Sequence, residues 1–286
     1  MMILQKRAKN KITKVFNSVY PRIQYRIGKL KGDNVVYTYF FSKVINFGDL
    51  LTPILLKNYG LKPIFFPIDR AEIVVVGSVL QSLPEEFSGF ILGSGLIEDV
   101  SRSFPYASIL ALRGELTRDR IGAPLSTVLG DPGLLAHKLI TTRQEKQFVL
   151  GIVQHYVDNS DKRIHNICQR NNGAILNIDV QREPLDVISD IDKCNFIMSS
   201  SLHGLIVADS LGIPNAWITL SNKVKGNGFK FYDYASAFGM KYEPQYLTGY
   251  ETLNNLINMT HKVDAGIQDV KSKLDTVFNR VKRELQ

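Results

Sequence analysis

The chain has 286 residues and a formal net charge of +8, and 44% of its residues are hydrophobic. That apolar share excludes a disordered chain, and the length suffices for two domains of roughly 100–150 residues each. We find neither a secretory leader nor an apolar run of about 18 residues, so we expect no membrane-spanning segment. Two cysteines, Cys168 and Cys194, are too few for a disulfide framework, which favours a reduced, cytoplasmic setting.

Residues 1–31 are strongly basic. They contain nine lysines or arginines and no acidic residue. Apolar residues recur between these cations at short helical steps, at Ile12, Val15, Phe16, Val19 and Ile23. Such a segment fits an anionic membrane surface, and an ordinary helix that packs its apolar stripe on the domain fits equally well. Nucleic acid is not expected as a partner, because no zinc-finger, RRM or KH signature accompanies the charge.

Five short apolar segments follow, and each ends in small or polar residues. We predict strands at residues 35–41, 73–76, 90–92, 109–112 and 127–129. A helix should follow the first strand, with Asp49 as its cap, one face formed by Leu50, Ile54, Leu55 and Tyr59, and its end at Gly60. A second short helix is expected at 115–121. This succession predicts a doubly wound parallel sheet with a site along the edge where its strands end.

The second half repeats this pattern. Residues 141–147 are polar throughout and are predicted to be a linker. Strands are expected at 148–153, 174–178, 196–198 and 215–220, with a helix at 185–191 between the second and third of them. Residues 221–230 hold two glycines and three lysines and are expected to be a mobile basic loop. From Leu253 onwards, apolar residues at three- and four-residue steps predict one long amphipathic helix or two in series.

The segment around His203 is the centre of the predicted site. Ser199, Ser200 and Ser201 follow a strand, and apolar residues at helical spacing then predict a helix over 202–211, which Gly212 and Pro214 end. His203 and Gly204 should therefore lie at a helix N-terminus just past the carboxyl end of a strand, where an open α/β sheet binds anions and other ligands. A serine-capped helix with a hydrogen-bonded structural histidine is the alternative that this local pattern leaves open.

Four short motifs occur in order along the chain. They are Asn46-x-Gly48-Asp49, Arg113-Gly114-x-Leu116-Thr117, Gly130-Asp131-Pro132, and Ser199-Ser200-x-Leu202-His203-Gly204 followed by Gly212-Ile213-Pro214. In this order and at these separations, over about residues 34–245, the set resembles the polysaccharide pyruvyl transferase family. The resemblance implies transfer of the enolpyruvyl unit of phosphoenolpyruvate (PEP) to sugar hydroxyls, usually as a cyclic ketal. The acceptor would be a bacterial surface polysaccharide, such as a capsule or exopolysaccharide, or its lipid-linked precursor.

The resemblance also implies roles for individual residues. It assigns the family's arginine to Arg113 and its histidine to His203. Where many members have an arginine directly before Leu-His-Gly, this chain has Ser201, so Lys223, Lys225 or Lys230 would have to replace that cation. Because histidine titrates near neutrality, His203 is the side chain best suited to protonate C3 of PEP. The expected substrate-binding residues are Arg113, Ser200, Ser201, Leu202, Gly204, Asn46, Asp49, Asp131, Lys225 and Lys230.

The fold implied by the family is α/β, with two Rossmann-like domains in a GT-B-like arrangement and the site in the cleft between them. We divide the chain into a basic N-terminal segment (1–33), an N-terminal α/β domain (34–145), a C-terminal α/β domain (146–248) and a C-terminal helical segment (249–286). We expect no metal and no cofactor besides PEP as co-substrate, a glycan or lipid-linked oligosaccharide as partner, and a location in the cytoplasm, at the inner face of the membrane if residues 1–31 bind lipid.

Two other functions remain open on the sequence alone. A GT-B-type glycosyltransferase that uses a nucleotide sugar would share the architecture, although the second half of the chain lacks the acidic Glu-x₇-Glu type of donor motif. A non-catalytic α/β module that docks through its basic N-terminus would need neither His203 at a helix start nor four matched loops.

Overall fold

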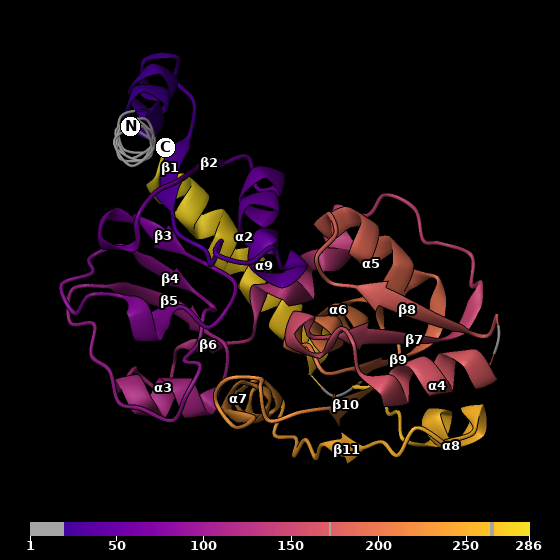
Figure 1. Cartoon of the computed structure of the whole chain (residues 1–286). Helices are drawn as coiled ribbons and strands as arrows, with labels where there is room; N and C mark the ends of the chain where they lie inside the picture. The colour runs from indigo at the N-terminus through magenta and orange to yellow at the C-terminus, as the bar shows by residue number, and fades with distance from the viewer. Residues whose placement is uncertain (1–19, 172, 264–265) are drawn as a thin grey trace, which may run out of the picture.

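The computed structural model describes residues 20–171, 173–263 and 266–286. Over these residues the chain is an α/β protein with two parallel sheets side by side and helices packed around them (Figure 1). The first sheet has the strand order β2-β1-β3-β4-β5-β6, and the second has the order β11-β10-β9-β7-β8. Every strand pairing described within them is parallel, which confirms the predicted sheet type.

The first sheet contains all five predicted strands, three of them (β1, β3 and β6) shorter than predicted, and one strand that was not predicted. Its elements are β1 (Val35–Thr38), α2 (Phe47–Asn58), β2 (Lys62–Phe65), η1 (Ile68–Arg70), β3 (Ile73–Val74), η2 (Leu80–Ser82), β4 (Phe90–Leu92), β5 (Ser108–Leu112), α3 (Glu115–Ile121), β6 (Val128–Leu129) and η3 (Pro132–Leu139). The unpredicted strand, β2, pairs only with β1. It carries Pro63, a residue that the sheet edge tolerates because an edge strand leaves N–H groups unpaired.

The start of α2 differs from the prediction. Asp49 does not cap the helix: the N-cap is Asn46, and Asp49 lies within the first turn. The reason is tertiary, because Phe47 is fully buried and its backbone N–H donates to Val180 O in the second half of the chain (2.9 Å), which fixes where the helix begins. Half of the predicted face is confirmed, because Leu55 and Tyr59 are buried. Leu50 and Ile54 are only half-buried, and Leu51 and Leu56 are in the core in their place.

The second sheet matches its prediction more closely. Its elements are β7 (Phe148–Gln154), η4 (Tyr156–Asp158), α4 (Lys162–Arg170), β8 (Ile175–Asp179), α5 (Pro184–Asp192), β9 (Cys194–Ser199), α6 (Leu202–Leu211), β10 (Asn215–Thr219), α7 (Phe229–Ser236) and β11 (Gln245–Tyr246). The predicted strands and both predicted helices, α5 and α6, are confirmed. We did not predict α4, α7 or β11. The segment predicted as a basic loop therefore ends in a helix, and Lys230 lies in the first turn of α7.

Helix α6 is buried over its whole length. All ten of its residues are buried, small and polar ones included. It packs on β9 and β10 of its own sheet, and also on α2 and η3 of the first half. The apolar spacing therefore predicted α6 correctly, but it predicted one buried face, whereas neighbouring elements bury the helix on all sides.

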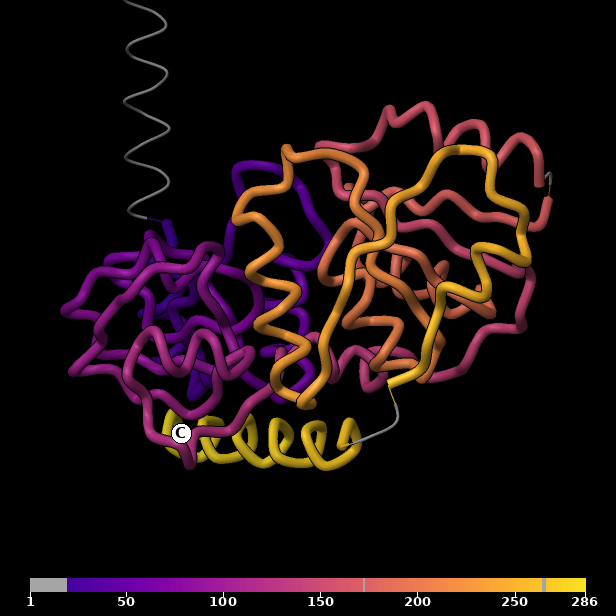
Figure 2. The backbone as a smooth tube through the Cα atoms, turned by 90° about the horizontal axis from the view of Figure 1, so that it is seen from below, coloured from indigo at the N-terminus to yellow at the C-terminus, as the bar shows by residue number. Residues whose placement is uncertain are grey.

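Two helices in series close the chain, as one of the two predicted alternatives required. They are α8 (Leu253–Asn258) and α9 (Ile267–Glu284). Figure 2 shows α9, in yellow, lying along the N-terminal half rather than beside the second sheet. There Phe278 stacks on Tyr59, the C-cap residue of α2 (ring centroids 4.6 Å apart), and a Cβ on Gly130 would approach Val270 Cγ1 to 2.4 Å. The chain thus returns to the first sheet. The predicted domain boundaries stay a prediction.

The predicted linker has no regular secondary structure, yet it is anchored. Asp192, at the end of α5, is fully buried and accepts hydrogen bonds from Gln144 N (2.7 Å) and Arg143 Nε (2.7 Å). Both contacts tie the connection between the two sheets to the second half of the chain.

Candidate active site at the start of helix α6

A pocket opens where the first turn of α6 meets the N-terminus of α2. Its volume is about 250 Å³, and side chains from both halves of the chain line it. The predicted site residues found in this lining are Asn46, Asp49, Ser201, Leu202, His203, Lys225 and Lys230. We call it the histidine pocket, because two histidines, His155 and His203, also line it. Ser200 lines a neighbouring pocket.

His203 lies in the first turn of α6 and faces α2. Its ring meets that of Phe47 edge-on (centroids 6.4 Å apart, 80° between planes). A Cβ on Gly48 would lie 1.9 Å from His203 Nδ1, so only glycine fits beneath the imidazole. The glycine of the Asn-x-Gly-Asp motif therefore makes room for the histidine of the Leu-His-Gly motif, and two motifs 155 residues apart in the sequence interlock.

The imidazole of His203 is buried without being fully satisfied. Its Nε2 has no hydrogen-bond partner among the described residues. Burial, together with the charges of Lys230 and Arg113, lowers the pKa of His203 to about 3, so the ring is neutral in the free protein. As in the alternative of a serine-capped helix, the N-cap residue is a serine, Ser201, but it makes no side-chain cap bond, and among the described residues His203 Nε2 has no partner.

The serines organise the strand ends instead. Ser199 Oγ accepts a hydrogen bond from Ser201 N (3.0 Å) and lies 2.9 Å from Val153 O. Ser200 Oγ accepts from His155 N (2.9 Å), which joins the ends of β9 and β7. His155 Nδ1 in turn accepts from Val157 N, and burial and Lys230 lower the pKa of His155 to about 3. Both histidines of the pocket are therefore neutral before a ligand binds.

Asp49 adds a carboxyl group with an unusual pKa. Burial raises the pKa of Asp49 to about 6, while a hydrogen bond donated by Asn46 Nδ2 (2.9 Å) and the charge of Lys230 oppose this shift. A Cβ on Gly77 would lie 2.7 Å from Asp49 Oδ1, so the backbone passes close to the carboxyl group. Near neutral pH part of the population keeps this carboxyl protonated, which makes it a second group able to exchange a proton.

Three lysines make the pocket cationic. Lys230 enters from α7, and burial lowers its pKa to about 8, so it remains charged at neutral pH. Lys223 and Lys225 enter from the preceding loop, and Lys225 pairs with Glu98 (3.3 Å). Gly226 fixes this loop against the first half, because a Cβ there would lie 1.9 Å from Ile97 O. These lysines supply charge next to Ser201, where the family resemblance implies an arginine.

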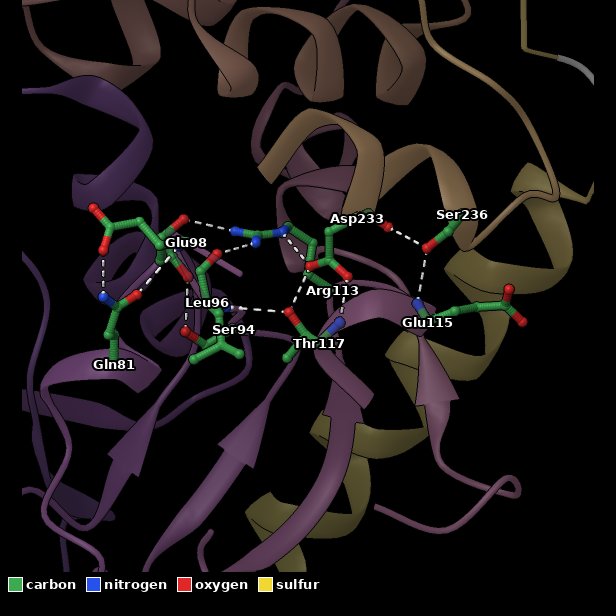
Figure 3. Close-up of polar contacts among 11 residues, drawn as sticks. Gln81, Ser94, Leu96, Glu98, Arg113, Glu115, Thr117, Asp233 and Ser236 are labelled. Atoms are coloured by element: carbon green, nitrogen blue, oxygen red, sulfur yellow. Dashed lines mark hydrogen bonds and ion pairs between the residues drawn. The ribbon is translucent and has the colours of Figure 1, made fainter. Parts of the chain in front are cut away.

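Arg113 lies outside the pocket lining and is fully buried. Figure 3 shows its guanidinium held between Asp233 of α7 and Leu96 of the first half. Nε donates to Asp233 (2.8 Å) and Nη1 donates to Ser78 Oγ (2.6 Å), and Ser78 does line the histidine pocket. Among the described residues, Ser78 is therefore the pocket-lining residue to which Arg113 hydrogen-bonds. A direct contact with substrate stays a prediction.

The rest of the Arg-Gly-x-Leu-Thr motif also contacts α7, through Asp233. Thr117 donates to the carboxylate of Asp233 from its backbone N (2.7 Å) and its hydroxyl (2.6 Å). A Cβ on Gly114 would lie 1.7 Å from Asp233 O, so glycine is required for this approach. We did not assign a role to Asp233 from the sequence. The sequence did contain one indication of such a partner: an arginine that is buried at the end of a strand needs a buried acidic residue to pair with.

Two further predicted site residues also lie outside the pocket. Asp131 caps η3 by accepting a hydrogen bond from Gly133 N (2.8 Å), and burial raises its pKa to about 7. Gly204 packs on Ser199, whose Oγ would lie 2.3 Å from a Cβ at that position. The structure gives both a local packing reason, and their contacts with substrate stay predictions.

The described residues also bear on metal binding, membrane spans and disulfides. Within these residues no group of three or more His, Cys, Asp or Glu side chains could hold a metal ion. The helices of the described part of the chain are all too short or too polar to cross a bilayer. Cys168 and Cys194 are free thiols.

The chain is an α/β protein whose histidine pocket lies beyond the carboxyl ends of parallel strands, which is where open α/β sheets bind their ligands. A family model, "Polysaccharide pyruvyl transferase", matches residues 4–222, and the chain belongs to this family. It is 30% identical over 219 residues to the uncharacterized protein L143 of Acanthamoeba polyphaga mimivirus, which covers 72% of this chain and 75% of L143. It is 29% identical over 215 residues to the succinoglycan biosynthesis protein ExoV of Rhizobium meliloti (strain 1021), which covers 72% of this chain and 66% of ExoV.

Proposed function

We propose that this protein transfers the pyruvyl unit of PEP to sugar hydroxyls of a surface polysaccharide or its lipid-linked precursor, and that the product is a cyclic ketal. Membership of the family supports pyruvyl transfer, and the name of ExoV supports a role in exopolysaccharide synthesis. The choice of PEP as donor rests on the histidine pocket. This pocket is small and cationic and lies at the N-terminus of α6, where backbone N–H groups can bind an anion.

The reaction needs one acid and two sugar hydroxyls. Protonation of C3 of PEP converts its methylene group to a methyl group and makes C2 electrophilic, and the first hydroxyl then adds to C2. The second hydroxyl adds as the C2–O bond to phosphate breaks, and the phosphate leaves. Of the two protons lost by the hydroxyls, one replaces the proton given to C3 and the other leaves with the phosphate. The lysines of the pocket bind the carboxylate and phosphate and stabilise the leaving group.

His203 is the proposed acid. In the free protein its pKa of about 3 leaves it neutral. The negative charges of bound PEP favour the imidazolium form, since a nearby opposite charge raises the pKa of a base. The unpartnered Nε2 is then the atom available to carry the proton. Asp49, with its pKa of about 6 in the same pocket, is the nearest alternative source.

We also propose that the two halves form Rossmann-like domains in a GT-B-like arrangement, with catalysis in the cleft between them. The supporting observation is that the histidine pocket takes Asn46 and Asp49 from one half and His155, His203 and Lys230 from the other. The glycosyltransferase alternative would use a similar cleft for a nucleotide diphosphate. Membership of the pyruvyl transferase family favours PEP instead.

Contact with an anionic membrane through residues 1–31 belongs to the same proposal. Residues 1–19 lie outside the described part of the chain, but residues 20–30 are helical. On this helix Ile23, Ile27 and Leu30 are 48%, 47% and 88% exposed, and each directly follows a cation in the sequence, namely Arg22, Arg26 and Lys29. Apolar side chains at this spacing among cations suit insertion at a lipid surface.

The decisive experiment incubates the protein with PEP and a panel of lipid-linked and aryl glycosides. We expect phosphate release that depends on the acceptor, and a mass gain of the acceptor equal to one pyruvyl ketal. Calorimetry with PEP and, separately, a UDP-sugar distinguishes the two transferases. Heat of binding from the UDP-sugar alone, with no phosphate released from PEP, would refute the proposal.

Vesicle binding tests the membrane contact separately. Ile27→Ser/Leu30→Ser should weaken binding to phosphatidylserine-containing vesicles and leave activity on a soluble acceptor unchanged. Since each basic residue near the surface contributes about 1 kcal/mol, binding should also fall with salt. Equal vesicle binding by both proteins would contradict this contact.

A further inference from the structure

A second pocket lies at the carboxyl end of β10, and we call it the aromatic pocket. Its volume is about 170 Å³, and four aromatic side chains line it: Trp217, Phe231, Tyr232 and Tyr246. The polar part of its lining consists of neutral hydroxyl and amide groups, including those of Thr219, Asn222 and Asn227. Among the described residues, no charged side chain contributes to the lining. In this respect it contrasts with the histidine pocket.

The two pockets adjoin along three segments of the chain. Ser200 lines the aromatic pocket, and the next residue, Ser201, lines the histidine pocket. Val224 lines the aromatic pocket between Lys223 and Lys225 of the other one, and Lys230 is followed by Phe231 in the same way. Because consecutive residues, whose Cα atoms are about 3.8 Å apart, line the two pockets, these three segments form a wall that both pockets share.

The aromatic side chains form a fixed back and an open rim. Trp217 stacks on Phe231 (centroids 4.3 Å apart, 7° between planes) and meets Tyr232 edge-on (5.3 Å, 81°). Trp217 and Phe231 are buried, whereas Tyr232 and Tyr246 are 41% and 71% exposed. The two tyrosines therefore have surface available for a ligand, and the stacked pair holds Tyr232 in place.

The backbone beside the pocket is also unusual. Asn227 has φ of 47°, and among the described residues it is the single non-glycine residue with a positive φ. Asparagine tolerates this conformation better than most residues, and such conformations cluster at ligand sites. Here it turns the loop between the lysines and α7, so that one segment lines both pockets.

We propose that the aromatic pocket binds one pyranose ring of the acceptor glycan. This inference rests on the proposed transfer of pyruvate from PEP in the adjoining pocket. A sugar ring has C–H faces that pack on aromatic rings and hydroxyls that bond to neutral hydroxyl and amide groups. The absence of charge along the described lining suits a neutral ligand, since a charge buried without a partner is costly. The volume is below the about 300–1,000 Å³ of drug-sized ligand sites, which matches a single ring.

Intrinsic fluorescence gives a direct test, because Trp217 is the single tryptophan of the chain. The protein is saturated with PEP and titrated with methyl pyranosides of glucose, galactose, mannose and N-acetylglucosamine. We expect a saturable change in emission with at least one of them. Tyr232→Ala and Tyr246→Ala should each weaken that affinity about tenfold, which equals about 1.4 kcal/mol. Tyr106→Ala is the matched control, because Tyr106 is 68% exposed and lines neither pocket.

The outcomes separate this inference from the proposed function. A flat response to every glycoside would overturn the inference, and so would equal affinities in the wild type and both tyrosine variants. A saturable response to uridine diphosphate but to no glycoside would also overturn it, in favour of a nucleotide site. Phosphate release from PEP with an unchanged acceptor KM in Tyr246→Ala overturns the pocket assignment alone. Glycoside binding without any phosphate release overturns the transfer alone.

Discussion

The clusters around Arg113 and His203 are both buried and both belong to the family motifs, but they differ in what their polar atoms contact. The Arg113 guanidinium is bonded to Asp233, Ser78 and Leu96, and Thr117 completes the bonding of Asp233. His203 keeps a buried Nε2 with no partner among the described residues, and it faces a pocket. A satisfied cluster holds two segments together, whereas an unsatisfied one is available to a ligand. Membership of a motif therefore does not by itself identify a substrate-binding residue.

The largest expected effect is on the stability of the Arg113 cluster. Arg113→Met leaves the buried Asp233 carboxylate without its cation, and breaking such a pair typically costs about 3–5 kcal/mol. The free energy of unfolding from urea titration measures this loss. Asp233→Leu combined with Arg113→Met should recover part of it, because no lone buried charge remains.

A matched control is Lys273→Met, which removes an exposed ion pair with Asp269 and should change stability by about 1 kcal/mol or less. If Arg113→Met had wild-type stability but no longer bound PEP, Arg113 would be a residue that binds PEP. The Arg113 cluster would then not be the purely structural counterpart of His203.

The next largest expected effect is on turnover, through His203. His203→Gln should lower turnover by about 10²–10⁴ because an amide cannot deliver a proton, while PEP binding and the unfolding free energy change little. Turnover and PEP affinity are measured separately, with His165→Gln, a change at an exposed histidine, as the control. Near wild-type turnover in His203→Gln would make the histidine a hydrogen-bond donor only, and Asp49 would become the first candidate for the acid.

Gly48→Ala tests whether the two motifs interlock. The new Cβ would lie 1.9 Å from His203 Nδ1 if nothing moved, so the imidazole must shift. A misplacement of about 1 Å can cost about 10² in rate, and we expect a loss of turnover of up to that size with folding retained. Gly173→Ala is the control for a strained glycine substitution outside the pocket: φ of Gly173 is +79°, but nothing lies within 4 Å of the new Cβ, so turnover should stay unchanged. Unchanged turnover in Gly48→Ala would show that the ring position does not matter.

The smallest predicted signal is proton uptake when PEP binds. At pH 7 the pKa of about 3 keeps His203 unprotonated in the free protein, and PEP raises that pKa, so binding should take up to one proton from solution. Calorimetry in buffers of different ionisation enthalpy measures the uptake. Asp49→Asn and His155→Gln distinguish the other titratable groups of the pocket, since each should retain the His203 contribution. Lys230, with a pKa of about 8, is already charged at this pH. Proton uptake in His203→Gln equal to that of the wild type would refute the assignment.

The same pKa shifts bear on acid stability. An unfolded chain protonates His203 below its ordinary pKa of 6.5, whereas the folded chain resists protonation down to about 3. His203 therefore contributes stability that is present above pH 6.5 and is lost as the pH falls towards 3. Asp49 acts in the opposite direction, because its raised pKa of about 6 makes its ionisation destabilising as the pH rises from about 4 to 6.

Local pattern was sufficient for the elements with continuous apolar runs or clear stop signals. It placed β7, β9, α5 and α6, and it put His203 at a helix start after a strand. The family resemblance, rather than the local pattern, assigned Asn46, Asp49, Lys225 and Lys230 to the same site, and all four line the histidine pocket. Side-chain period and end signals of this kind are local properties of the chain. The same pattern missed β2 and β11, which are short edge strands, and α7, which follows a glycine-rich turn.

The tertiary structure alone decided the roles of individual side chains. The hydrogen bond from Phe47 N to Val180 O fixes where α2 begins, so that Asp49 lies in its first turn and not at its cap. The carboxylate of Asp233, 120 residues away in the sequence, accepts a hydrogen bond from the guanidinium of Arg113, for which the motif had suggested a contact with the donor. That donor contact stays a prediction. Burial then shifted the pKa of His203 far below that of a free histidine. The sequence by itself determined the order of strands, helices and motifs, because these depend on neighbours along the chain. Contacts, burial and pKa depend on residues that are distant in the chain and close in space.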